Sequence, residues 1–231
     1  MQVAVIGASG GVGASVLSAA LALRLSTRAS VALVDLDDRG AGMDFVLGVE
    51  QSPGLRWDDL SEAGADIDGA ALFSRLVAVE ALRLLSYGPS PPHPTTEKRA
   101  VGSQLRTVLD ALEGATDYVV LDAGAHLPQP GSAVVLVVSA TCRGIRSGSW
   151  WLELLDRSGN RRDDLVVVVD RISHRAIPAE QVGAALGCST LTSWVREPDL
   201  AIGLESGDRR CLREPSRDGL VAAALRLSEL L

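Results

Sequence analysis

The sequence predicts an α/β fold built on a doubly wound, mostly parallel sheet. Short apolar runs alternate along the 231 residues with longer segments of helical periodicity, which is the pattern of βαβ units. The runs are rich in Val, Ile and Leu and nearly free of charge, as expected of parallel strands that are covered by helices on both faces. A glycine-rich turn between the first run and the first helical segment is typical of the same fold class.

The elements follow in order. The expected strands are Val3–Ile6, Val31–Val34, Val119–Leu121, Val134–Val138 and Leu165–Val169, with Leu82–Leu85 as a further candidate. The expected helices are Ser15–Leu25, Glu97–Leu112, Ile145–Leu155, Ala179–Leu186 and Arg217–Leu231. The last of these has an apolar stripe and a balanced polar face, which favours packing on the core over membrane anchoring. Four prolines between Ser86 and Thr96 predict a loop there.

Composition limits the class of protein. With 47% hydrophobic and 22% charged residues, the chain can bury a core, and we expect a single domain over residues 1–231. The net charge of −7 argues against direct nucleic-acid binding through global charge. The three cysteines are odd in number and far apart, so neither a disulfide framework nor a zinc site is expected. We expect a cytoplasmic protein.

The glycine-rich turn is the main candidate site. Residues 7–15 read Gly-Ala-Ser-Gly-Gly-Val-Gly-Ala-Ser between a strand and a helix. Such a turn points backbone N–H groups and the positive end of the helix dipole at an anion, so it can hold a phosphate group. Asp35, Asp37 and Asp122 follow two other strands, and the carboxyl ends of parallel strands meet at one edge of the sheet. We therefore expect three carboxylates near the turn.

One interpretation of the turn is dinucleotide binding. Gly7-x-x-Gly10-x-x-Gly13 resembles the loop of atypical short-chain dehydrogenase-like NAD(P)-binding proteins, and Asp35 lies where an acid would bind the ribose. Such enzymes use a Tyr-x-x-x-Lys pair. Neither Tyr87 nor Tyr118 is followed by lysine at that spacing. An NAD(P)-binding protein stays open as the alternative.

Five segments in order resemble the MinD/ParA family of deviant Walker A ATPases. They are Ser9–Ser15 for the phosphate loop, Val31–Asp37 with its Asp-x-Asp, Met43–Val49, Asp117–Asp122 for the Walker B strand, and Val166–Arg171. The resemblance implies a P-loop NTPase-like fold, ATP or ADP with Mg²⁺ as cofactor, a homodimer, and a role in spatial positioning.

Two further segments, Leu55–Leu60 and Asp68–Leu72, resemble the CpaE/TadZ branch of that family, and more narrowly the actinobacterial CpaE-like septum-site-determining group. This resemblance implies partners from cell division or from Tad-type pilus and secretion machinery, with peripheral membrane association through those partners. Many CpaE-type proteins carry an N-terminal receiver-like domain, and we expect no separate domain of that kind in this chain.

The family resemblance also assigns roles to residues. It implies a nucleotide-binding set made up of Ser9, Gly10, Gly11, Val12, Gly13, Ala14, Ser15 and Arg171. Ser15 and Asp122 would hold Mg²⁺, and Asp37 would position an attacking water.

The sequence departs from the family pattern at the positions that carry charge. Ser9 and Ala14 stand where the family has its two loop lysines, and Asp170 stands where the family has an amide that reads adenine. Because phosphoryl transfer depends on charge neutralisation, we expect a pseudo-ATPase whose hydrolysis is weak or absent. A pure interaction scaffold with an empty site is the other alternative.

Overall fold

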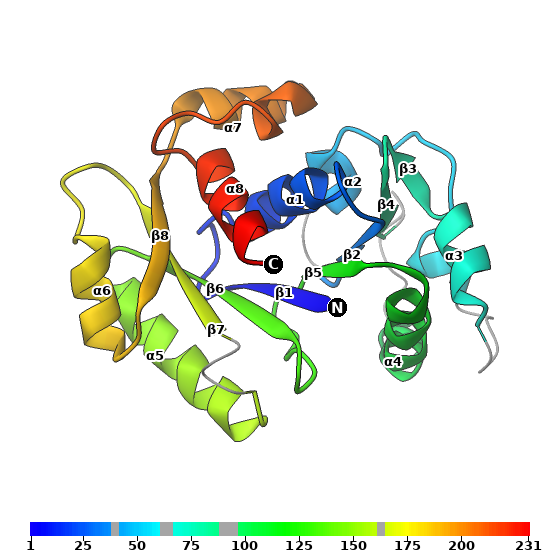
Figure 1. The fold of residues 1–231 in the computed structure, drawn as a ribbon, viewed down its shortest axis with the longest axis horizontal. Helices are drawn as coiled ribbons and strands as arrows, with labels where there is room; N and C mark the ends of the chain where they lie inside the picture. Colours follow the sequence, from blue (N-terminus) through cyan, green and yellow to red (C-terminus); the bar gives the residue numbers. More distant parts are fainter. Residues whose placement is uncertain (38–41, 61–66, 88–96, 161–164) are drawn as a thin grey trace.

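The computed structural model describes residues 1–37, 42–60, 67–87, 97–160 and 165–231. These residues form an eight-stranded sheet in the order β3-β4-β2-β5-β1-β6-β7-β8, in which every neighbouring pair is parallel except the antiparallel β3–β4 pair (Figure 1). The strands are β1 Gln2–Gly7, β2 Val31–Asp35, β3 Val77–Val79, β4 Leu82–Leu85, β5 Tyr118–Asp122, β6 Ala133–Ser139, β7 Leu165–Arg171 and β8 Thr190–Val195. The predicted fold class is confirmed.

Helices cover both faces of the sheet. The α-helices are α1 Ala14–Leu25, α2 Met43–Val46, α3 Gly69–Arg75, α4 Glu97–Ala115, α5 Cys142–Arg157, α6 Ala179–Leu186, α7 Pro198–Glu205 and α8 Leu220–Leu230, and two 3₁₀ turns are η1 Trp57–Leu60 and η3 Arg209–Leu212. In Figure 1, α1, α2, α7 and α8 lie on one side of the sheet and α4, α5 and α6 on the other.

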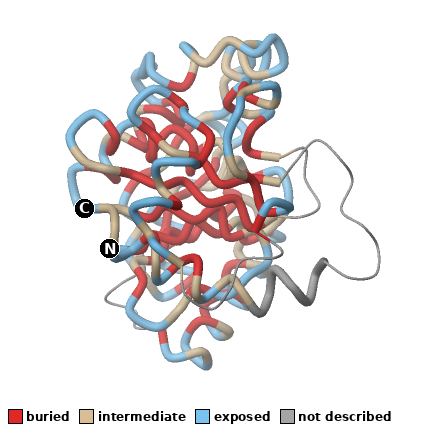
Figure 2. Tube along the Cα trace, turned by 90° about the vertical axis from the view of Figure 1, so that its right-hand side faces the viewer, coloured by how far each residue is buried: buried red, intermediate tan, exposed pale blue. Residues whose placement is uncertain are grey.

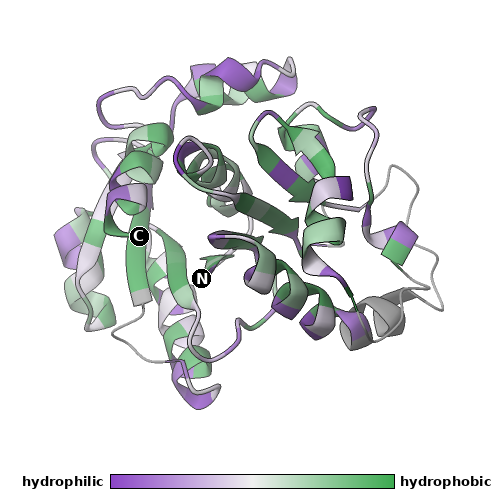
Figure 3. Cartoon of the chain, turned by 45° about the vertical axis from the view of Figure 1, so that its right-hand side comes forward, coloured by the Kyte–Doolittle hydropathy of each residue, from purple (hydrophilic) through white to green (hydrophobic). Residues whose placement is uncertain are grey.

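Strand alternation divides the core between the two faces. Val3 and Val5 of β1 pack with α1 and α8, whereas Ala4 and Ile6 pack with α4, α5 and α6 on the opposite face. Both sets are fully buried, and Figure 2 shows the buried strands at the centre of the molecule. The central strands are therefore mostly hydrophobic in Figure 3, which is why the sequence could reveal them as apolar runs.

The structure extends the predicted elements. The strand candidate at Leu82–Leu85 is β4, whereas the edge strands β3 and β8 were not predicted. β3 has only three residues, and in β8 only Thr192 and Trp194 are buried, so neither forms a long apolar run. α5 begins at Cys142 because the Thr141 hydroxyl accepts a hydrogen bond from the Gly144 N–H at 3.0 Å.

The C-terminal helix α8 begins at Leu220, later than the predicted start at Arg217. Its buried residues Ala224 and Leu227 pack on the core, as expected for this segment. Most of the proline-rich loop predicted at Ser86–Thr96 lies outside the described residues. Of the helices that the structure describes, none combines the length and the apolarity that crossing a membrane requires.

The strand order bears on the dinucleotide alternative. In the dinucleotide-binding fold the strand order is 3-2-1-4-5-6, so the second strand lies beside the first. Here β5 lies between β1 and β2, with Val3 paired to Val120 and Leu33 paired to Val120 from the other side. Asp35 at the end of β2 is thus one strand further from the glycine turn than a ribose-binding acid of that fold. This topology is not that of the NAD(P)-binding alternative.

Candidate functional site

The glycine-rich turn forms a loop between β1 and α1, with α1 beginning at Ala14. Gly11 and Gly13 have φ angles of 71° and 84°, in the left-handed region that favours glycine. A Cβ on Gly13 would lie 3.3 Å from the side chains of both Trp194 and Leu220, so the C-terminal end of the loop is packed closely on the core. This arrangement directs the loop and the N-terminus of α1 toward the carboxyl edge of the sheet.

A cleft of about 640 Å³ opens beside the loop. Its walls are residues 7–16 on one side and residues from the ends of β2 and β5, together with α5, on the other: Leu36, Asp37, Asp122, Gly124, Ala125, His126 and Trp151. The nucleotide-binding residues expected from Ser9 to Ser15 all line this cleft. The structure therefore brings together the glycine loop and two of the three expected carboxylates.

Asp122 is the carboxylate that contacts Ser15, at the end of the glycine-rich turn. It lies at the end of β5, is 3% exposed, and is hydrogen-bonded to Ser15 and, to a lesser extent, to Ser18. Burial, reinforced by the negative charges of Asp35 and Asp37, raises the pKa of Asp122 to about 7. The hydroxyl and the carboxylate expected to hold Mg²⁺ are thus in contact, and a bound cation would favour the ionised carboxylate.

Asp35 has a different environment, although it is the register partner of Asp122 on the adjacent strand. Its carboxylate accepts hydrogen bonds from the N–H groups of Met43 at 2.8 Å and Asp37 at 3.0 Å and from the Ser86 hydroxyl at 3.1 Å. Burial outweighs these contacts and raises the pKa of Asp35 to about 6. Asp35 therefore holds the start of α2 and the turn after β2 in place.

Asp37 lies in the wall of the cleft, facing Gly124. A Cβ at Gly124 would be 3.1 Å from the Asp37 Cβ, so the absence of a side chain at 124 lets the two segments approach. This places Asp37 in the same cleft as the glycine loop. Its expected role in positioning a water stays a prediction.

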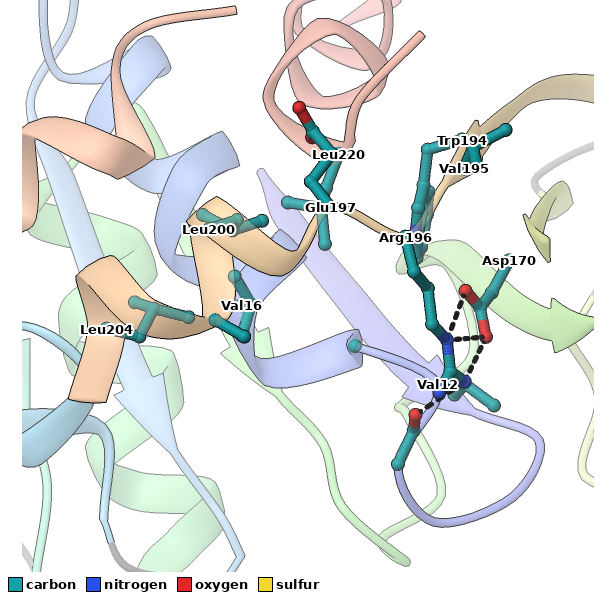
Figure 4. A pocket seen from close by; sticks show the side chains of 13 residues that line it. Val12, Val16, Asp170, Trp194, Val195, Arg196, Glu197, Leu200, Leu204 and Leu220 are labelled. Carbon is teal, nitrogen blue, oxygen red and sulfur yellow. Dashed lines mark hydrogen bonds and ion pairs between the residues drawn. The ribbon is translucent and has the colours of Figure 1, made fainter. Parts of the chain in front are cut away.

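On the other side of the loop, a buried carboxylate faces an arginine that the sequence analysis did not identify. Asp170, at the end of β7, is fully buried, and its two oxygens accept hydrogen bonds from the Arg196 Nε at 2.9 and 3.0 Å. The Arg196 Nη2 also bonds to Asp170, and it donates to the Gly11 carbonyl at 2.8 Å. Figure 4 shows the Arg196 side chain between Asp170 and the loop.

An apolar cavity of about 180 Å³ adjoins this arginine. It lies between α7 and α1 and is lined mainly by Val16, Trp194, Leu200, Leu204 and Leu220 (Figure 4). Because Arg196 already satisfies both oxygens of Asp170, this carboxylate is part of an internal ion pair. A nucleotide base at position 170 would therefore meet Asp170 together with Arg196, and not the Asp170 carboxylate alone.

Arg171, expected in the nucleotide-binding set, follows Asp170 but points into its own loop. Its Nη2 donates to the His174 carbonyl at 2.8 Å. It lines neither the cleft nor the apolar cavity described above. Its role toward a nucleotide stays a prediction.

The loop lacks the lysines of an active phosphate site. Ser9 lies in the loop and Ala14 is the first residue of α1, and both line the cleft. In the part of the chain that the structure describes, Arg196 is the cation whose hydrogen bond reaches the loop tip, and it contacts a carbonyl oxygen.

The residues present fit a magnesium nucleotide better than a metal held by the protein alone. Within the described ranges, no group of three or more His, Cys, Asp or Glu side chains is arranged to hold a metal ion. The Ser15 hydroxyl and the Asp122 carboxylate offer two ligands, and Mg²⁺ is usually completed by phosphate oxygens and water. The backbone N–H groups of the loop would hold those phosphates.

In a comparison with known proteins, no family model matches the chain. An uncharacterized protein of Mycobacterium tuberculosis, present in two strains, is 31% identical over 242 residues, and the chain spans 63% of the length of these curated relatives. Among solved structures, a ParA family ATPase from Chlorobium tepidum superposes with a TM-score of 0.79 at 19% identity, covering 100% of this chain and 99% of that one.

Two MinD structures are similarly close. The cell division ATPase MinD of Pyrococcus furiosus gives a TM-score of 0.78 at 19% identity, with 100% of this chain and 99% of that chain covered. The septum site-determining protein MinD of Pyrococcus horikoshii, solved with Mg-ADP, gives 0.77 at 20% identity, with 99% and 94% covered. The chain has the fold of the MinD and ParA ATPases. At these identities the likeness establishes the fold, and function has to be argued from the site.

Proposed function

We propose that this chain is a cytoplasmic nucleotide-binding protein of the MinD/ParA type in which ATP hydrolysis is weak or absent. The observation that carries the proposal is the glycine loop. It combines left-handed glycines at 11 and 13 with the contact between Ser15 and Asp122, which suits a magnesium nucleotide, but it has Ser9 and Ala14 in the lysine positions.

The proposed loss of turnover follows from the missing charge. Phosphoryl transfer relies on positioning and on cations that neutralise developing charge, and removing one such group costs about a hundredfold or more in rate. Bound Mg²⁺ would supply part of that charge. Ser15 and Asp122 would hold the ion, and Asp37 would orient a water. Carboxylates without a lysine repel phosphate, so binding would depend strongly on Mg²⁺.

We propose that the biological role is spatial positioning, at the septum site or with Tad-type pilus or secretion machinery, as in the CpaE/TadZ branch. Its support is the fold shared with a ParA family ATPase, with a cell division ATPase MinD and with a septum site-determining protein MinD. The MinD of Aquifex aeolicus was solved in a complex with MinC, which shows that this fold can bind a division partner in that protein. Membrane association would be peripheral and through such partners.

We propose a homodimer that uses the face of the glycine loop and depends only weakly on nucleotide, because no lysine crosses to the partner's phosphates. Gly10 is the position at which to test this face: it is exposed, and a Cβ there would meet nothing within 4 Å. Gly11 is less suitable, since its φ of 71° would strain any side chain. Sedimentation of Gly10→Trp should show a monomer with an unchanged fold, and a persisting dimer would place the interface elsewhere.

Thermal shift and phosphate release together test the proposal. Mg·ADP and Mg·ATP should raise the melting temperature, because ligands that bind only the native state stabilise it. Phosphate release under saturating Mg·ATP should match a blank without protein. Turnover like that of an active ATPase contradicts the proposed loss of hydrolysis. A shift with NADPH alone supports dinucleotide binding, and no shift with any of the three supports a scaffold with an empty site.

A further inference from the structure

The tip of the glycine loop has little to hold its shape by packing. Gly10 and Gly11 are both exposed, and a Cβ on either would meet nothing within 4 Å. Glycine has the largest backbone freedom of any residue, so an unpacked pair of glycines is costly to order. The two ends of the loop are better fixed, since the Ala8 N–H donates to the Val137 carbonyl at 2.8 Å and Gly13 packs on Trp194.

One side chain reaches this tip from far along the sequence. The Arg196 Nη2 donates to the Gly11 carbonyl at 2.8 Å, although the two residues are 185 positions apart. The backbone of Arg196 is itself fixed, because its N–H donates to the Arg171 carbonyl at 3.0 Å just beyond the β7–β8 pairing. The loop tip is thereby connected to the far edge of the parallel sheet.

The buried Asp170 gives this contact its rigidity. Both carboxylate oxygens of Asp170 accept hydrogen bonds from Arg196, and the Asp170 residue is fully buried. A planar guanidinium held through Nε and Nη2 has little rotational freedom left, so it presents the donor on Nη2 to Gly11 in a fixed direction. A lysine ammonium has no such fork.

We propose that Arg196, oriented by Asp170, is a positioning residue that tethers the tip of the glycine loop and holds it in its observed shape without nucleotide. In this chain a side chain of the protein does the ordering that a bound phosphate would otherwise do. The carbonyl of Gly11 is fixed toward Arg196, which restricts the neighbouring peptide groups of the loop. The inference concerns the nucleotide-free protein, so it can fail or hold independently of the proposed nucleotide binding.

Hydrogen–deuterium exchange of the intact, nucleotide-free chain tests the tether. In Arg196→Lys, the positive charge beside Asp170 is kept but the fork that also reaches Gly11 is lost, so the protein should stay folded. We expect the peptide covering residues 8–16 to exchange about tenfold faster than in the wild type. Arg210→Lys is the matched control, because Arg210 bonds to Asp208 through its Nε and Nη2 outside the glycine loop, and it should leave exchange of this peptide unchanged.

A second variant tests the role of Asp170. Asp170→Asn keeps the shape of the side chain but removes the charge that orients Arg196, and it should accelerate exchange of residues 8–16 in the same direction. Unchanged exchange of this peptide in both Arg196→Lys and Asp170→Asn, with both proteins folded by circular dichroism, would overturn the proposal. If exchange of residues 8–16 accelerates no more than exchange of the rest of the chain, the proposal is also overturned, because the loop would then report only the lower stability of the whole fold and not the loss of a tether.

Discussion

Buried carboxylates lie on both sides of the glycine loop, and their charge is compensated in different ways on the two sides. On the β7–β8 side, the fully buried Asp170 faces the guanidinium of Arg196. On the β2–β5 side, Asp35 accepts hydrogen bonds from two backbone N–H groups and a serine hydroxyl, Asp122 has serine hydroxyls beside it, and burial raises the pKa of both. The first side is neutralised within the protein. On the second side, a proton or a bound cation can balance the charge of the carboxylates.

This difference separates a structural side of the site from a side that can respond to a ligand. The Asp170–Arg196 pair resists change, because removing Arg196 leaves the Asp170 carboxylate buried without compensation. Burial raises the pKa of the Asp122 carboxyl toward neutral pH, and a cation bound beside it would favour the ionised form. We therefore expect Mg²⁺ to act on the Asp122 side.

The largest expected effect is loss of the internal ion pair. Arg196→Met leaves the Asp170 carboxylate buried without a partner, which should lower the free energy of unfolding by about 3 kcal/mol. For a chain of this size the melting temperature should fall by about 10 °C. Thermal and urea unfolding would measure both quantities.

The matched control for that variant is Asp170→Asn combined with Arg196→Met. Since the double variant buries no uncompensated charge, it should recover most of the lost stability. A double variant as unstable as Arg196→Met alone would mean that the arginine stabilises the fold by a route other than Asp170.

The next effect concerns pH. The pKa of Asp122 is raised in the folded state from 3.8 to about 7, so the folded protein binds more protons than the unfolded chain between these values. Its contribution to stability is therefore greatest at low pH and is lost as the pH rises toward 7 and beyond. Asp122→Asn cannot ionise, and between pH 5 and pH 8 its stability relative to the wild type should rise by about 3 kcal/mol.

Urea unfolding at several pH values in EDTA would test this. Asn is tolerable at 122 because serine hydroxyls can donate or accept. Asp35→Asn is the contrasting variant, because its amide would oppose the N–H of Met43 or of Asp37 and should destabilise the protein at every pH. Equal pH profiles for wild type and Asp122→Asn would contradict the raised pKa.

A lysine introduced at position 14 should act on the side of the loop that carries Asp122. Ala14→Lys places an ammonium group in the cleft that Asp122 lines, and it should raise the free energy of unfolding at pH 8 by about 1 kcal/mol. It should also increase the thermal shift that Mg·ADP produces. Ala14→Met, similar in length but neutral, controls for packing. If Met stabilises as much as Lys, the effect is not electrostatic.

The smallest expected effect distinguishes two serines that both contact Asp122. Ser15→Ala and Ser18→Ala should each lower the free energy of unfolding by about 1 kcal/mol or less. Of the two, only Ser15, in the first turn of α1, lines the cleft, so only Ser15→Ala should reduce the thermal shift with Mg·ADP. An equal reduction in both variants would mean that Ser15 contributes no ligand to the metal.

Much of the fold was predictable from local pattern. A parallel strand covered on both faces is an uninterrupted apolar run, so β1, β2 and β5 to β7 were found, and the fold class is confirmed. The edge strands β3 and β8 were missed because neither forms such a run. β8 buries alternate residues, Thr192 and Trp194, and this period-two pattern is a weaker signal than an apolar run.

The sequence by itself determined that a glycine loop follows the first strand and that Asp35, Asp37 and Asp122 lie just after predicted apolar runs. Both facts depend on residues close together in the chain. The tertiary structure alone decided that β5 separates β1 from β2, which distinguishes the two interpretations of the loop, and that Arg196 reaches Gly11. The physical reason is that strand order and a contact across 185 positions arise from packing between distant segments, which no local periodicity encodes.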